Sequence, residues 1–339
     1  MASDIKTAFR RIATEEAWSI PEHMAALLNL TKSMWDDLDL RLPRRSAVPG
    51  SPLYTRLVDT DGERLEIMDA DGVSIHLLSL TSPGVQMFDA DLACEISTLA
   101  NDRMAAAIKR HPTRYAGLAA FAPQDPKRAV KEMERAIKTL KLNGFILNSH
   151  TGGEYLDNPK FWPILECAEA LDRAIYIHPR CPPTQAGKAY ADYGMFTALW
   201  GYQAEVSVHC MRMILSGLFE RFPKLKIVIG HMGESIPFNI WRADYIYGVH
   251  KEWGDIPGNL KPSEVFKRNF WITNSGVEHG PALKYCIEVL GADRIIWAID
   301  YPYQVSPPAV KFMNEVDISK EDKEKIFHKN AERIFHIAP

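Results

Sequence analysis

Short runs of apolar residues, each about the length of a β-strand, recur along this chain and alternate with amphipathic stretches. Several runs are almost continuously apolar, such as Ile227-Val228-Ile229 and Ile295-Ile296-Trp297-Ala298-Ile299. This pattern is typical of parallel strands that are buried on both faces. We expect strands at residues 11–15, 74–81, 115–122, 144–148, 174–178, 226–230, 270–274 and 295–300.

The segments between these runs have the spacing of amphipathic helices. Residues 125–141 carry charged side chains on one face and apolar ones on the other, with Asp125 as a natural N-cap and Pro126 in the first turn. Similar spacing predicts helices at residues 90–110, 159–171, 206–222 and 281–290. Repeated strand–helix alternation favours an α/β fold that closes into a barrel, with an open doubly wound sheet as the competitor.

A sequence pattern that is missing helps to choose between the two architectures. No Gly-x-Gly-x-x-Gly follows the first strand, which counts against a dinucleotide-binding fold. We therefore expect one (β/α)8 TIM barrel over residues 1–339, with long loop insertions at residues 38–54 and 180–194.

The charge balance of the chain disfavours several kinds of partner. A net charge of −3 and an isoelectric point near 6.4 give no electrostatic case for nucleic acid or an anionic membrane. No stretch approaches the roughly 18 consecutive apolar residues of a membrane span. The five cysteines are widely spaced and form no Cys-x-x-Cys pair, so we expect reduced thiols in a cytoplasmic protein.

Polar residues stand at the carboxyl ends of the predicted strands. In an α/β barrel these ends meet at one mouth, where the connecting loops carry the chemistry. The residues are carboxylates, imidazoles, amides and hydroxyls: Glu15, Glu16, Asn148, Ser149, His150, His178, His231, Glu234, Asn274, Ser275 and Asp300. The mouth of the predicted barrel is therefore the candidate functional site.

Glu15, His178 and Asp300 form a plausible site for one divalent cation. Carboxylate oxygens and an imidazole nitrogen suit zinc or manganese, and three protein ligands leave positions for water and substrate. A single histidine that ends a buried strand is more often a hydrogen-bonded core residue. Several acids and histidines at one mouth favour the metal, because clustered unpaired carboxylates would otherwise repel one another.

His231 and Glu234 lie on one turn after the sixth strand. A carboxylate beside an imidazole fixes its tautomer and raises its basicity, which suits proton transfer; the alternative is a structural turn in which Glu234 caps the next helix. Arg242 lies in the helical stretch 237–247. Its guanidinium could hold a substrate carboxylate through two hydrogen bonds, and a surface salt bridge explains it equally well.

These strand-end residues make the sequence recognisable, and it resembles the decarboxylase branch of the amidohydrolase superfamily. The motifs that carry the likeness span almost the whole chain in the right order. They are Ala13-Thr14-Glu15-Glu16-Ala17, Leu80-Thr81-Ser82-Pro83-Gly84-Val85-Gln86, Ala122-Pro123-Gln124-Asp125-Pro126, Asn148-Ser149-His150-Thr151, Tyr176-Ile177-His178-Pro179, Gly230-His231-Met232-Gly233-Glu234, Thr273-Asn274-Ser275-Gly276 and Asp300-Tyr301-Pro302-Tyr303. Within that branch it is most similar to the 5-carboxyvanillate decarboxylases.

The resemblance implies a metal-dependent, non-oxidative decarboxylase of a hydroxylated aromatic acid. The substrate would be 5-carboxyvanillate or a related o-hydroxybenzoate such as γ-resorcylate or 2,3-dihydroxybenzoate. The resemblance makes Glu15, His178 and Asp300 ligands of one Mn²⁺ or Zn²⁺ ion, and His231 and Glu234 catalytic partners. We expect the substrate-binding residues to be Arg242, Tyr303, His150 and Asn274.

Three further expectations come with the resemblance. Ala17 stands where many relatives have a metal-binding histidine, so the ion should have one imidazole ligand fewer. An arginine in the 38–54 segment, Arg44 or Arg45, is a candidate to grip the substrate. The family also implies a homodimer or homotetramer.

Our mechanistic hypothesis is that Asp300 delivers a proton to the ring carbon that bears the carboxylate, and that His231, oriented by Glu234, restores its protonation state. Two alternatives remain open. A metal-dependent hydrolase of lactones or amides would use the same barrel, although the His-x-His pair common after the first strand of such hydrolases is absent. A non-catalytic barrel that binds a small ligand would need none of these acids and histidines.

Overall fold

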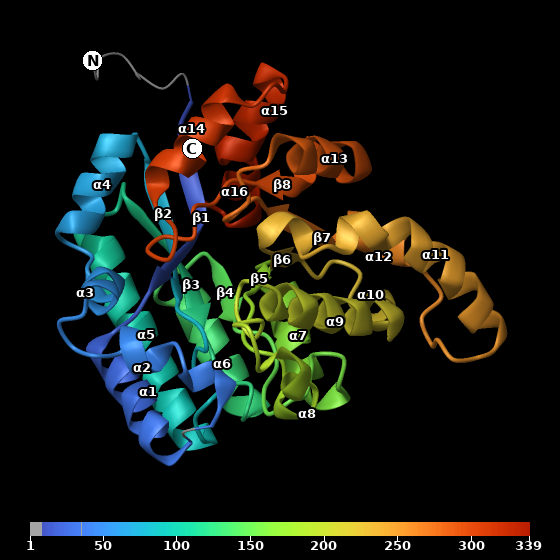
Figure 1. Ribbon diagram of the computed structural model, residues 1–339, viewed down its shortest axis with the longest axis horizontal. Coiled ribbons are helices and arrows are strands. Elements are labelled where there is room, and N and C mark those ends of the chain that lie inside the picture. Colours follow the sequence, from blue (N-terminus) through green and yellow to red (C-terminus); the bar gives the residue numbers. More distant parts are fainter. Residues whose placement is uncertain (1–8, 35) are drawn as a thin grey trace.

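Eight parallel strands form one sheet in the order β1 to β8 in the computed structural model, which describes residues 9–34 and 36–339 (Figure 1). Each predicted strand is present. Their bounds are β1 Ile12–Trp18, β2 Ile75–Leu80, β3 Tyr115–Ala120, β4 Gly144–Leu147, β5 Ile175–Ile177, β6 Ile227–Ile229, β7 Phe270–Thr273 and β8 Ile295–Ile296. All residues of these strands are buried, which explains why the apolar runs are nearly continuous.

The sheet curls into a nearly closed barrel, so the prediction of a (β/α)8 TIM barrel is confirmed. Parallel ladders join each strand to the next from β1 to β8. Between the last and first strands, single bonds replace a ladder: the Ala17 amide donates to the Tyr301 carbonyl at 2.7 Å, and Thr14 Oγ1 donates to the Trp297 carbonyl at 2.9 Å.

Helices alternate with the strands and surround the barrel (Figure 1). The longer ones are α1 Pro21–Ser33, α4 Glu63–Asp71, α5 Ala90–Arg110, α6 Pro126–Lys138, α7 Trp162–Ala170, α9 Gly201–Leu215, α11 Ile236–Glu252, α12 Pro262–Asn269, α13 Gly280–Leu290 and α14 Ser306–Glu315. The predicted N-cap of α6 is confirmed, because the Asp125 carboxylate accepts hydrogen bonds from the amides of Lys127 and Arg128, each at 3.1 Å.

Two segments that the sequence predicted as loops contain helical turns. The first holds η1 Leu38–Leu40, α2 Pro43–Ser46 and the start of α3 Pro52–Val58, and the second holds α8 Thr184–Gly187 and η3 Lys188–Tyr190. The 38–54 segment is rich in proline, which is typical of loops, but Pro43 and Pro52 stand in the first turns of helices, where a missing N–H costs nothing.

The predicted helix at residues 206–222 is interrupted. It is split into α9 and α10 Leu218–Arg221 by Gly217, whose φ of 80° ends the first helix. No helix in the two described ranges is long and apolar enough to cross a membrane.

Candidate metal centre

Glu15, His178 and Asp300 come together at the mouth of the barrel, although they lie far apart in the sequence. Glu15 lies in β1, His178 follows β5 and Asp300 follows β8. One ligand atom from each lies within 4.8 Å of the other two. The structure therefore brings together the three side chains that the sequence singled out as metal ligands.

The two carboxylate oxygens of Glu15 have different surroundings. Oε2 accepts hydrogen bonds from the Tyr176 hydroxyl and from Thr273 Oγ1, the latter at 3.0 Å. Oε1 is buried and has no hydrogen-bond partner among the described residues. It lies 3.6 Å from Nε2 of His178 and 3.5 Å from Nε2 of His231. Burying a carboxylate oxygen without a hydrogen-bond partner costs free energy of folding. Oε1 is therefore available as a ligand for a cation.

The charge of Glu15 fits this arrangement. Burial raises the pKa of its carboxyl, but the imidazoles of His231 and His178 and the Tyr176 hydroxyl lower it by more, so that the pKa ends below its usual value. Glu15 is therefore ionised at neutral pH.

Gly230 gives the Glu15 carboxylate the room it occupies. A Cβ atom on Gly230 would lie 2.9 Å from each Glu15 oxygen, closer than van der Waals contact allows. Glycine immediately before His231 is thus required by the close approach of β6 to this carboxylate.

His178 presents its Nε2 lone pair toward the cluster. Its Nδ1 lies 2.8 Å from the Pro179 carbonyl oxygen, and because a carbonyl only accepts, Nδ1 carries the proton. A backbone carbonyl that fixes the tautomer in this way is the usual support of a metal-binding histidine.

His231 and Glu234 form a close pair beside the cluster. Nδ1 of His231 lies 2.6 Å from Oε1 of Glu234. Burial lowers the pKa of His231, but the carboxylates of Glu234 and Glu15 raise it by more, so the pKa ends well above its usual value. The imidazole is therefore held as a cation that can give up a proton.

The turn that carries this pair has an unusual backbone. Residues 231–235 all have positive φ, between 50° and 76°. Only Gly233 among them adopts such a conformation without strain. The strain persists because helix α9 holds the turn in place: the hydroxyl of Ser207 in α9 donates a hydrogen bond to the Glu234 carbonyl. Strained backbone of this kind is concentrated at functional sites.

Asp300 is the third candidate ligand and also has left-handed backbone, with a φ of 75°. Burial and the nearby Glu15 carboxylate raise the pKa of its carboxyl well above the usual value. Its carboxyl oxygens make no side-chain hydrogen bond within the described part of the chain. Asp300 is therefore the acid of the cluster that is least restrained by neighbouring donors.

The predicted substrate-binding residues are distributed unevenly around the cluster. The hydroxyl of Tyr303 lies 2.8 Å from Oγ1 of Thr81, at the end of β2. Asn274 is buried, and its Oδ1 accepts a hydrogen bond from the Ala298 amide. Both residues lie at the mouth of the barrel. The Oδ1 atom of Asn274 is used within the protein, where it links β7 to the segment after β8.

His150 uses both ring nitrogens inside the protein. Nδ1 accepts from the Gly153 amide at 3.2 Å, and Nε2 lies 2.9 Å from the Cys181 carbonyl. Burial and the Arg180 guanidinium lower the pKa of His150 to about 4, so the ring is neutral. It lines a cavity of about 750 Å³ with Gln86, Met87 and Arg180, among others.

Arg242 makes no hydrogen bond or ion pair to Glu15, His178 or Asp300 in the described part of the chain. It lies on α11, and its side chain is exposed. Arg45 is exposed on α2, and Arg44 is half-buried there. The roles predicted for these arginines stay predictions.

Comparison with known proteins assigns the family. The sequence pattern of the amidohydrolase family matches residues 56–337. The chain belongs to the amidohydrolase family. The prediction of amidohydrolase membership is confirmed, and decarboxylases of aromatic acids are among the similar proteins.

Three similar proteins show where this amidohydrolase lies within its family. The structure of 5-carboxyvanillate decarboxylase LigW from Sphingomonas paucimobilis is 50% identical, with a TM-score of 0.95 over 98% of this chain and 100% of that one. The 5-carboxyvanillate decarboxylase of Novosphingobium aromaticivorans, complexed with manganese and 4-hydroxy-3-methoxy-5-nitrobenzoic acid, is 35% identical, with a TM-score of 0.93 over 98% of both chains. The γ-resorcylate decarboxylase of a Polaromonas species is 34% identical over 84% of this chain and 90% of its own length.

Two further residues belong to this amidohydrolase site, although the sequence predicted no role for either. Tyr176 and Thr273 hold Oε2 of Glu15. Tyr176 stands two positions before His178, and side chains two apart on a strand share a face. A polar residue with that spacing from a predicted ligand, inside an otherwise apolar strand, is the signal that could have identified it.

Proposed function

We propose that this amidohydrolase is a metal-dependent, non-oxidative decarboxylase of a hydroxylated aromatic acid. The observation that carries the proposal is the Glu15–His178–Asp300 cluster, in which Oε1 of Glu15 is buried without a hydrogen-bond partner among the described residues. Similar proteins with this fold are named as 5-carboxyvanillate and γ-resorcylate decarboxylases. The substrate we propose is 5-carboxyvanillate or a related o-hydroxybenzoate.

The donor set fits a divalent ion of the manganese type. Two carboxylates and one neutral imidazole are ligands that both Mn²⁺ and Zn²⁺ accept. We choose manganese because a similar decarboxylase was crystallised with it. When bound, the ion would supply positive charge that orients the substrate's phenolate and carboxylate oxygens.

The protein residues would act by moving one proton. A carboxylate leaves an aromatic ring after the carbon that bears it is protonated, so an acid must face that carbon. We assign this proton to Asp300, the carboxyl of the cluster least restrained by hydrogen bonds. The ring–carboxylate bond then breaks, its electron pair restores aromaticity, and carbon dioxide leaves. His231, held by Glu234 at 2.6 Å, would return a proton to Asp300.

Substrate contacts are part of the proposal. Tyr303 presents a hydroxyl at the mouth beside Thr81 and would donate a hydrogen bond to a substrate oxygen. Asn274 and His150 would shape the pocket, since their hydrogen bonds to Ala298, Gly153 and Cys181 restrain both side chains.

The decisive experiment assays purified, Mn²⁺-loaded protein with 5-carboxyvanillate, γ-resorcylate and 2,3-dihydroxybenzoate. Product and carbon dioxide are quantified together. We expect stoichiometric carbon dioxide from one of these acids, and an Asp300→Asn variant that loses about 10²–10⁴ in turnover. Hydrolysis of lactones or amides without carbon dioxide release from any aromatic acid would replace the proposal with the hydrolase alternative.

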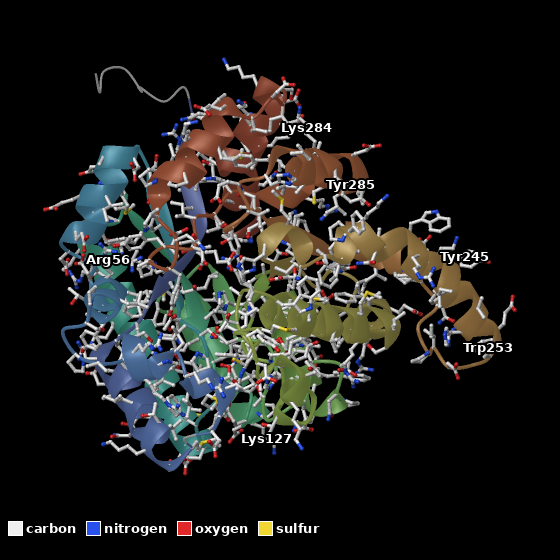
Figure 2. All side chains as sticks on the ribbon, in the orientation of Figure 1. Arg56, Lys127, Tyr245, Trp253, Lys284 and Tyr285 are labelled. Atoms are coloured by element: carbon white, nitrogen blue, oxygen red, sulfur yellow. The ribbon has the colours of Figure 1, made fainter. Side chains whose placement is uncertain are left out.

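We further propose that the chain forms a homo-oligomer through the outer face of α11. Phe238, Trp241, Tyr245 and Trp253 are 77%, 76%, 65% and 68% exposed, and Figure 2 shows Tyr245 and Trp253 at the outer edge of the molecule. Together such side chains offer roughly 500 Å² of largely apolar surface, much of the about 800 Å² that each partner of a standard interface buries.

In such an oligomer, Arg242 would lie within the interface. On α11 it lies four positions after Phe238 and three before Tyr245, so it shares their face of the helix and a neighbouring copy packed there would cover it. Sedimentation of wild-type protein and of Trp241→Glu tests the interface. We expect a dimer or tetramer that dissociates in the variant, and a wild-type monomer would contradict the proposal.

A further inference from the structure

Glu16, the residue beside the candidate ligand Glu15, contacts the chain on both sides of Asp300. Its Oε1 accepts a hydrogen bond from the Ile299 amide at 3.1 Å, and its Oε2 accepts one from the Tyr301 amide at 3.2 Å. One carboxyl group therefore holds the N–H groups of the two residues that flank Asp300 in the chain. The contact joins β1 to the segment after β8, where the barrel has single bonds instead of a ladder.

The surroundings of Glu16 are built around its carboxylate. The side chain is completely buried, so both oxygens need partners. The fully buried guanidinium of Arg64 donates to the Ala17 carbonyl at 2.8 Å and lies 4.8 Å from the centre of the Tyr301 ring. Burial raises the pKa of the Glu16 carboxyl to about 7, and the Ile299 amide, the Arg64 charge and the Tyr301 amide oppose this rise. The buried Arg64 guanidinium, the buried Glu16 carboxyl group and two backbone amides thus lie together between β1 and the segment after β8.

The backbone at Asp300 needs such support. A φ of 75° is uncommon for a residue with a side chain, and conformations of this kind persist only where the surroundings determine them. Glu16 holds the N–H of Ile299, the residue before Asp300, and the N–H of Tyr301, the residue after it. Those two restraints set the direction in which the Asp300 side chain leaves the backbone, toward Glu15 and His178.

We propose that Glu16 is a positioning residue that holds the Asp300 carboxyl in the metal cluster. The inference rests on the proposed function only for its kinetic consequence, because the effect on metal binding follows from the geometry. Loss of one acceptor oxygen would free one of the two amides and let Asp300 turn away. Partners that orient a metal ligand typically contribute 10–100-fold to metal affinity.

The test compares Glu16→Gln with Thr14→Val. Glutamine keeps the shape of the side chain but sets an amide donor against one of the two backbone N–H groups. Thr14 is the matched control, because its hydroxyl also joins β1 to the segment after β8, at the Trp297 carbonyl, but does not flank Asp300. Both variants are measured for thermal unfolding without metal, for Mn²⁺ affinity by calorimetry, and for kcat and KM on the best substrate.

We expect Glu16→Gln to bind Mn²⁺ 10–100-fold more weakly than the wild type, and to lower kcat by a larger factor than it raises KM. Thr14→Val is expected to bind Mn²⁺ like the wild type. Equal Mn²⁺ affinity in Glu16→Gln and wild type would overturn the proposal, as would equal weakening in both variants. If Glu16→Gln does not fold, Glu16→Asp, which keeps the charge but cannot reach both amides, is measured with the same expectation. Failure of both Glu16 variants to fold would show a role in the whole barrel and not at Asp300.

The Mn²⁺ measurement separates this inference from the proposed function. Wild-type protein that binds Mn²⁺ tightly but releases no carbon dioxide would contradict the decarboxylase proposal alone. In that case, weakened Mn²⁺ binding in Glu16→Gln would still support the positioning role.

Discussion

Oε1 of Glu15 lies 3.5 Å from Nε2 of His231, and Nδ1 of the same ring lies 2.6 Å from Oε1 of Glu234. The imidazole therefore stands between a carboxylate of the metal cluster and a carboxylate outside it. A cation bound in the cluster and the Glu234 charge would act on the pKa of the same imidazole from opposite sides. From this geometry we expect metal binding to be coupled to the protonation of His231.

Tyr176→Phe should weaken metal binding without unfolding the protein. The variant loses the hydroxyl that holds Oε2 of Glu15, so the carboxylate can rotate and form its hydrogen bonds with Oε1 instead. We expect about 10–100-fold weaker Mn²⁺ binding and a loss of about 1 kcal/mol in the free energy of unfolding. Calorimetric titration and denaturant unfolding measure the two effects; unchanged Mn²⁺ affinity would show that Thr273 alone suffices to orient Glu15.

Gly230→Ala should disrupt the centre by steric contact. The new methyl group would lie 2.9 Å from both Glu15 oxygens, so the carboxylate must move. We expect bound manganese to fall well below one ion per chain in metal analysis. Gly248→Ala is the control: a Cβ there meets nothing within 4 Å, and in helix α11 alanine should stabilise by up to about 1 kcal/mol. Full manganese occupancy in Gly230→Ala would refute this account of the glycine.

Glu205 should make the protein less stable as pH rises. Burial raises the pKa of this carboxyl to about 8 from an ordinary value of 4.5, so between these values the folded chain binds a proton that the unfolded chain has released. Stability from this group is complete below about pH 4.5 and is lost as pH rises through about 8. The slope is at most about 1.4 kcal/mol per pH unit.

Glu205→Gln removes that titration, while an amide can still accept the hydrogen bond from Ser149 Oγ. Unfolding free energies of wild type and variant, measured at several pH values between 5 and 8, should diverge in slope, with the variant flatter. Parallel curves would show that Glu205 is already ionised in the folded protein throughout this range.

The left-handed turn at residues 231–235 can be tested at its exposed end. Ser235 has a φ of 68° and is exposed. Because β-branched residues fit this conformation worst, Ser235→Val should lose about 1–3 kcal/mol of unfolding free energy, whereas Ser235→Gly should lose none. Chemical denaturation of both variants checks this, and equal stability of the two would mean that the turn relaxes at no cost.

The sequence predicted the barrel and its cluster because both depend on short-range signals. Continuous apolar runs mark buried parallel strands, and polar residues at their carboxyl ends must meet at one mouth; Glu15, His178 and Asp300 follow from these two rules. The helical turns in the 38–54 segment were missed because a proline in the first turn of a helix looks, in sequence, like a proline in a loop.

Contacts that depend on tertiary geometry could not be predicted from the sequence. The spacing of Tyr176 from His178 places it on the same face, but nothing in the sequence shows that Tyr176 and Thr273 share one oxygen of Glu15. Nothing local to Glu16 shows that its carboxyl group binds the residues on both sides of Asp300. The positive φ values of residues 231–235 were equally hidden, because only one of the five is glycine. Arg242 shows the reverse case, in which a residue suited to substrate binding lies exposed on α11.

The close approach of Gly230 to Glu15 also limits how this centre can be moved between proteins. A designer who grafts Glu15, His178 and Asp300 onto another barrel must also carry over a strand that has glycine at the position facing Glu15. The missing side chain at that position is therefore as necessary to the transplanted centre as the ligands themselves. A host barrel with any larger residue there would contain all three ligands, but the acid would lack the space to take its position beside the other two.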